Sequence, residues 1–89
     1  MPAEIQTAFS TVLRRFREER KMSQEDLAFE SNVGRVSIAM METGKRLPTL
    51  PTLFRLARGL SVRPGEFVEA VSAETRAEDE RASAVTRPD

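Results

Sequence analysis

Apolar residues recur at helical spacing through the first twenty residues of the chain. They fall at intervals of three and four residues, so a helix would gather them on one face. These positions are Ile5, Phe9, Val12, Leu13 and Phe16. The pattern predicts a first helix from about residue 6 to 20, whose other face is a solvated surface of mixed charge. That surface consists of Arg14, Arg15, Glu18, Glu19, Arg20 and Lys21.

The next stretch predicts two short helices joined by a tight turn. Ser23 is a suitable N-cap for the first of them, because its hydroxyl can accept a bond from a free backbone N–H. Asn32 falls in the turn, where it tolerates a positive φ better than most residues do. Gly44 suits the left-handed conformation that closes the second helix. The expected helices are 23–31 and 35–42.

The second short helix separates inward from outward positions. The inward positions are Val33, Ile38 and Met41, and the outward positions are Arg35, Ser37 and Met40. Two helices joined this tightly have the geometry that lays the second helix in the major groove of DNA.

The C-terminal half predicts two more helices. Thr49 can cap a fourth helix, and Pro51 is suited to its first turn. The wide apolar face of this helix comprises Leu50, Leu53, Phe54, Leu56, Ala57 and Leu60. Pro64 can start a fifth helix, expected near 64–73, with Phe67, Val68 and Val71 as its apolar positions.

Residues 74–89 differ in composition from the rest of the chain. They are rich in Ala, Glu and Arg, so they are expected to be either a helical extension or a disordered segment. The chain carries no strand signal of any strength and no internal repeat. The expected architecture is therefore one all-α domain at residues 1–73, followed by this charged tail.

Composition removes several classes of function. The 89 residues include no Cys and no His, which removes disulfides, thiolate zinc sites and the usual general base. No apolar run reaches membrane-spanning length, and Glu4 follows the first three residues where a signal peptide would be apolar. The chain has no glycine-rich phosphate loop and no convincing carboxylate pair. We therefore expect a cytoplasmic protein that is not an enzyme, with no metal, cofactor or small-molecule ligand.

The charge balance weakens a nucleic-acid interpretation without removing it. The formal net charge is zero, whereas DNA-binding domains commonly carry a basic patch. Residues 1–73 hold 11 basic and 9 acidic residues, and residues 74–89 hold 3 and 5. The predicted domain is thus mildly basic, and the salt-dependent, non-specific part of any DNA binding should be modest.

Three phrases in a fixed order carry a family resemblance. They are SQEDLA, E-x-G-K-R-x-P and TLFRLARGL, within residues 13–67. This stretch resembles the lambda-repressor-like, Cro/Xre-type helix-turn-helix DNA-binding domains, which implies a compact five-helix bundle. The ESNVGR segment is also similar to the subgroup that includes restriction–modification controller proteins.

The resemblance implies roles for individual residues. Gln24 would touch the DNA backbone or a base edge, and Arg35, Val36 and Met40 would face the bases. The residues that would approach phosphates are Ser37, Thr43, Lys45 and Arg46. Arg17 and Glu42 match a structural pair that joins the first helix to the end of the third. Because members of this family often dimerise through the fifth helix, Phe67, Val68 and Val71 are the expected dimer interface.

Arg35 is the best candidate for reading a base, since a guanidinium can bond O6 and N7 of guanine together. Val36 and Met40 stand where the family often has polar residues. They could pack against thymine methyl groups or belong to a protein-binding patch.

Two hypotheses follow. In the first, the protein is a sequence-specific transcriptional regulator, most naturally a repressor, that binds double-stranded DNA as a homodimer on a partly palindromic operator. In the second, it is an interaction module of antitoxin or adaptor type that uses the same fold to bind another protein.

Overall fold

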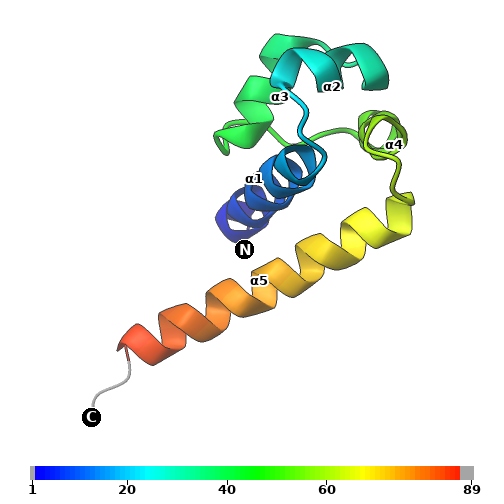
Figure 1. The fold of residues 1–89 in the computed structure, drawn as a ribbon. Coiled ribbons are helices and arrows are strands. Elements are labelled where there is room, and N and C mark those ends of the chain that lie inside the picture. The colour runs from blue at the N-terminus through cyan, green and yellow to red at the C-terminus, as the bar shows by residue number, and fades with distance from the viewer. Residues whose placement is uncertain (1, 87–89) are drawn as a thin grey trace.

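The computed structural model describes residues 2–86 of the chain, and the side chains of residues 5–81. Within that range it contains five α-helices and no strand (Figure 1). The helices are α1 (Pro2–Glu19), α2 (Gln24–Ser31), α3 (Arg35–Glu42), α4 (Leu50–Gly59) and α5 (Pro64–Thr86). The all-α, five-helix architecture expected from the sequence is confirmed.

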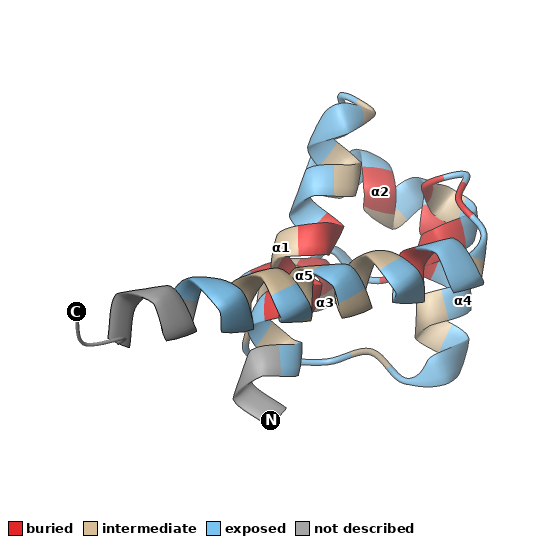
Figure 2. Ribbon diagram, turned by 90° about the horizontal axis from the view of Figure 1, so that it is seen from below, coloured by how far each residue is buried: buried red, intermediate tan, exposed pale blue. Residues whose placement is uncertain are grey.

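The core forms where one face of each helix meets the others (Figure 2). Every helix contributes a side chain with no exposed surface, and these include Leu13, Leu27, Ile38, Leu56 and Phe67. Phe67 of α5 stacks on Phe9 and meets the edge of Phe16, with 5.4 Å between ring centroids in both pairs. Aromatic pairs of this kind contribute about 0.5–1.5 kcal/mol beyond area burial, so they help to hold α5 against α1.

The two short helices and their turn lie where the sequence predicts them. Ser23 caps α2 by accepting a bond from the Asp26 N–H at 2.9 Å, and the Asp26 carboxylate accepts one from the Ser23 N–H at 2.9 Å. This reciprocal arrangement satisfies two N–H groups that the helix leaves free. Asn32 and Gly44 have φ values of 59° and 78°, so both adopt the left-handed conformation that was expected of them.

Two expectations for α1 are wrong. The helix begins at Pro2 rather than near residue 6, and Pro is well suited to a first turn because its missing N–H would have no helical partner there. Arg20 is not a freely solvated residue. Its Nε donates to the Leu60 carbonyl at 2.5 Å, and its guanidinium lies 5.3 Å from the centre of the Phe16 ring. Arg20 therefore joins the end of α1 to the end of α4.

The apolar face of α4 is only partly covered. Leu56, Ala57 and Leu60 are buried, but Leu50 and Phe54 are 66% and 52% exposed. The surface that α2 and α5 offer to α4 is narrower than the apolar stripe that the sequence predicts. The apolar face predicted for this helix therefore stays open to solvent at these two positions.

The α2 and α4 helices approach each other closely at Gly59. A Cβ added to this glycine would lie 2.8 Å from the Ser31 Cβ and 2.9 Å from its Cα. Ser31 has no exposed surface, and its hydroxyl donates to the Leu27 carbonyl at 2.6 Å. The contact holds the end of α2, and with it the turn into α3, against α4.

The α5 helix continues well past its expected end near residue 73. It runs to Thr86 and projects beyond the other helices (Figure 1), because Ala, Glu and Arg are good helix formers. Glu74 pairs with Arg15 of α1 at 3.5 Å and with Arg81 at 3.3 Å. Partial burial and the neighbouring Glu74 raise the pKa of Glu78. Residues 87–89 of the predicted tail lie outside the described part of the chain.

Candidate nucleic-acid interface

The inner face of α3 is packed into the protein. Ile38 and Met41 have 0% and 1% of their surface exposed, and Val33 in the preceding turn is buried as well. The helix is therefore anchored on the side that faces α1 and α2. Its position relative to the rest of the bundle is set by these contacts.

The outer face of α3 is open and carries three of the predicted base-facing residues. Arg35 and Val36 are exposed, Val36 by 66%, and Met40 is half-buried. No hydrogen bond or ion pair with any described residue holds Arg35. Its guanidinium therefore retains all of its donors for a partner outside the protein.

A buried ion pair lies behind the far end of α3. Arg17 donates from Nε to Oε2 of Glu42 at 2.6 Å and from Nη2 to Oε1 at 2.9 Å. A third bond runs from Arg17 Nη1 to the Met22 carbonyl at 2.7 Å. The side chains are 13% and 4% exposed. The hydrogen bond to Glu42 raises the pKa of Arg17 above its usual value, although burial opposes the shift.

Gln24 belongs to this buried network, which the sequence did not indicate. Its Nε2 donates to Glu42 Oε1 at 3.0 Å, and the residue is only half-exposed. A carboxylate accepts and cannot donate, so the amide nitrogen must be the end that faces Glu42. At least one of the amide hydrogens that Gln24 could offer to DNA is therefore used inside the protein.

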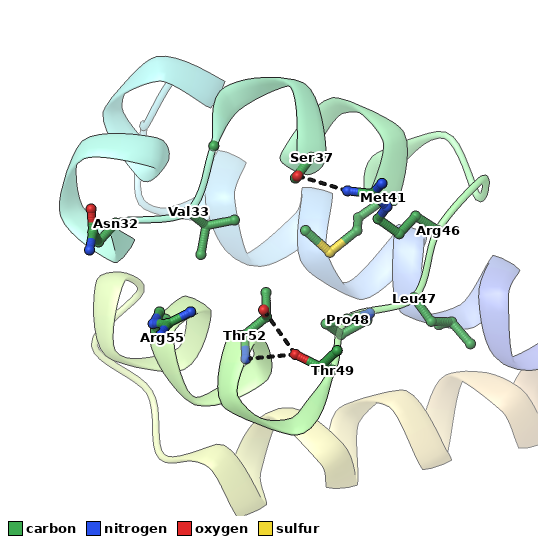
Figure 3. Close-up of a pocket in the computed structure, with 11 residues that line it drawn as sticks. Asn32, Val33, Ser37, Met41, Arg46, Leu47, Pro48, Thr49, Thr52 and Arg55 are labelled. Atoms are coloured by element: carbon green, nitrogen blue, oxygen red, sulfur yellow. Dashed lines mark hydrogen bonds between the residues drawn. The ribbon is translucent and has the colours of Figure 1, made fainter.

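The residues predicted to contact phosphates differ in whether their side chains are already bonded within the protein. The Lys45 side chain is exposed and has no partner among the described residues. Arg46 folds back so that its Nη1 donates to the Ser37 hydroxyl at 2.9 Å (Figure 3). The Thr43 hydroxyl donates to the carbonyls of Ala39 and Met40 at 3.0 and 3.1 Å. In this rotamer Thr43 has no proton left for a phosphate, which can only accept.

The predicted dimer residues do not share one environment. Phe67 has no exposed surface, so it is a core residue and its assignment to a dimer surface is wrong. Val68 is 50% exposed and Val71 is half-buried, and both line a shallow apolar groove of about 230 Å³. Ile5 and Leu47, which the sequence did not suggest for this role, line the same groove.

Comparison with known proteins places this architecture in a family. A family model described as helix-turn-helix matches residues 13–67. The chain belongs to the Cro/Xre-type helix-turn-helix family. Among curated proteins, none matches this sequence.

Solved structures similar to this helix-turn-helix protein are restriction–modification controller proteins. One is the C.Esp1396I tetramer in complex with its natural 35 base-pair operator. It is 34% identical and has a TM-score of 0.74, and the match covers 80% of this chain and 93% of that one. Another is C.AhdI from Aeromonas hydrophila, at 34% identity and a TM-score of 0.67, which covers 70% and 94%. These neighbours do not favour the antitoxin or adaptor alternative.

No described helix has the length and apolar character needed to cross a membrane. Among the described residues, no group of three or more carboxylate side chains is arranged so that it could hold a metal ion.

Proposed function

We propose that this protein is a transcriptional regulator that binds double-stranded DNA sequence-specifically, as a homodimer, by placing α3 in the major groove. The observation that carries the proposal is the exposed Arg35 side chain, which bonds to no described residue and stands at the start of a helix whose inner face is packed. A base-reading side chain needs a fixed backbone behind it and free donors in front of it. Arg35 has both.

Base recognition by α3 combines a polar contact with apolar ones. Arg35 bonds O6 and N7 of a guanine, and Val36 and Met40 pack against thymine methyl groups. The 66% exposure of Val36 supports this assignment, because it leaves an apolar side chain accessible on the outer face of α3. Lys45 and Arg46 in the loop after α3 supply phosphate contacts, which set the register of the helix on the duplex.

Dimerisation uses the exposed part of α5 and its apolar neighbours. Val68, Val71, Ile5 and Leu47 form a groove that water would otherwise fill, and covering it with a second copy buries apolar surface. A two-fold dimer places two α3 helices about 34 Å apart, which matches one turn of duplex. The similar protein C.Esp1396I is a tetramer on a 35 base-pair operator, which supports self-association and a regulatory role of the controller type. Repression then follows from occupancy of a promoter.

The decisive experiment is an unbiased selection of random duplexes with the full chain at low salt, followed by sequencing. The expected result is two inverted half-sites whose centres lie one helical turn apart, each with a guanine and neighbouring A·T pairs. Recovery of sequences with no shared element would overturn the proposal.

The dimer has a separate test by sedimentation. A carboxylate buried in an apolar interface is costly, so Val68→Asp should shift the protein to monomer. Val36→Asp adds the same charge on the exposed face of α3, outside the groove. It should leave the oligomeric state unchanged. If the two variants had the same oligomeric state, α5 would not be part of the dimer interface.

A further inference from the structure

A second polar site lies beside α3, on its α4 side. The turn before α3, the helix itself, the loop after it and the first half of α4 enclose a cleft of about 330 Å³ (Figure 3). Arg46 enters it from the loop, and Arg55 enters from the opposite wall on α4. The sequence indicated no role for Arg55, because it lies outside the helix-turn-helix segment.

The charges in this cleft are unbalanced. Neither Arg46 nor Arg55 makes an ion pair within the described part of the chain, and Arg55 makes no hydrogen bond there either. None of the described residues that line the cleft is Asp or Glu. Two arginines that line one concave surface without a counterion among the described residues make that surface positively charged, which favours an anion there.

The hydroxyl groups of the cleft have unused protons. Ser37 Oγ accepts the bond from Arg46, so its own O–H is free to donate. Thr49 Oγ1 donates to Thr52 Oγ1 at 3.1 Å and accepts from the Thr52 N–H at 3.3 Å. Thr52 therefore also keeps an O–H to donate. The side chains of Ser37 and Thr52 supply neutral donors beside the two cations, a combination that suits phosphate oxygens.

We propose that this cleft is a phosphate-binding site, that its ligand is a phosphodiester of the DNA strand beside the groove that α3 enters, and that Arg55 is a DNA-contact residue. The assignment to DNA rests on the proposed function, because Ser37 of α3 and Arg46 of the loop after it line the cleft and are also predicted phosphate contacts. A strand that flanks the groove passes the mouth of the cleft once α3 is inserted. Arg55 then contacts the DNA backbone from the α4 side of the cleft.

The test compares Arg55→Ala with Arg58→Ala in the full-length chain. Arg58 is an exposed arginine on the same helix that does not line the cleft. The dissociation constant is measured from about 50 to 200 mM salt on the selected duplex and on a scrambled one. Losing one phosphate contact should lower the slope of log affinity against log salt by about 0.9 per protomer, equally on both duplexes. Arg58→Ala should leave the slope unchanged.

The outcomes separate this inference from the proposed function. A wild-type slope in Arg55→Ala, with specific binding intact, overturns the phosphate site and leaves the regulator assignment standing. Absence of binding by the wild-type protein overturns the regulator assignment itself. A second measurement addresses free phosphate: unfolding temperatures in inorganic phosphate and in chloride at equal ionic strength. Stabilisation by phosphate that Arg55→Ala abolishes, together with an unchanged DNA slope, would overturn the DNA assignment in favour of a free anion. Circular dichroism of each variant verifies that it folds.

Discussion

The two faces of α3 differ in how their side chains are held. On the inner side, Ile38 and Met41 are buried, and Glu42 accepts bonds from two other helices. On the outer side, Arg35 and Val36 are exposed, and the Arg35 side chain makes no hydrogen bond or ion pair with a described residue. The α3 helix, eight residues long, therefore has one face whose side chains are fixed by packing and hydrogen bonds, and one face that is open to solvent.

This difference separates stability from recognition. Changes on the inner face alter packing or leave a buried charge without a partner, so they act on the fold. Changes on the outer face remove nothing that the folded protein needs, so they act on binding. A pair of variants drawn from the two faces can therefore test whether recognition and folding are independent.

The largest effect is expected from Glu42→Ala. Removing this carboxylate leaves Arg17 buried without its counterion, which should cost about 3–5 kcal/mol of unfolding free energy. Urea unfolding monitored by circular dichroism measures the loss. Glu18→Ala, on the exposed face of α1, is the control and should change stability by no more than about 0.5 kcal/mol. If the two variants lost the same free energy of unfolding, the buried network would contribute nothing to stability.

Gly59→Ala should be next. The added methyl would overlap Ser31 at 2.8–2.9 Å, and such overpacking costs about 1–3 kcal/mol. Gly65→Ala is the matched control, because its Cβ would meet nothing within 4 Å and alanine favours the helix by up to about 1 kcal/mol. The two variants should therefore move the unfolding temperature in opposite directions. A shift in the same direction would show that α2 and α4 can separate without loss.

Arg35→Ala tests the outer face. Affinity for the selected duplex should fall by about 1–3 kcal/mol, with sequence preference relaxed at one position in each half-site. Unfolding free energy should stay within about 0.5 kcal/mol of the wild type. A repeated duplex selection and a urea titration supply the two readings. Loss of stability comparable to that of Glu42→Ala would break the separation between the two faces.

Gly34→Ser should produce the smallest change, at the junction of the two faces. Gly34 is the N-cap of α3 and provides no side-chain bond. A serine hydroxyl there can accept from a free N–H of the first turn, which should stabilise the protein by a few tenths of a kcal/mol. The nearest atom to the new Cβ is Ser37 Oγ at 4.0 Å, so the substitution meets no obstacle. Gly44→Ser, at a φ of 78°, should instead destabilise the protein, and differential scanning calorimetry can compare the two.

Much of the fold was predictable because its signals are local. The cap at Ser23 and the positive φ values at Asn32 and Gly44 depend on residues within one helical turn. The inward positions of α3 follow from a period of 3.6 residues. The sequence leaves the end of α5 open between a helical extension and a disordered segment, because an Ala- and Glu-rich composition is compatible with both. Helix propensity and the Arg15–Glu74 pair favour the helix.

The candidate site was predictable only in part. Arg35 lies on the exposed face that the spacing indicates, and Val36, which the resemblance assigns to the bases, is exposed as well. Ser37 and Met40, also expected to look outward, are only half-exposed. The second partner of Glu42 was not predictable, because Gln24 and Glu42 are 18 residues apart and meet only after α2 and α3 pack. The same limit applies to Arg55, which comes from the next helix along the chain.

The sequence by itself determined the helices, their caps, the tight turn and the exposed arginine, since these depend on neighbouring residues and on helical period. The tertiary structure decided which apolar residues are covered and what each long polar side chain reaches. Phe67 and Val68 are adjacent and equally apolar in pattern, yet one is buried and the other half-exposed. Gln24 turns to Glu42, and Arg20 turns to Leu60. Helix packing determines these burials and partners, because burial and hydrogen bonding between helices depend on distances that no local pattern encodes.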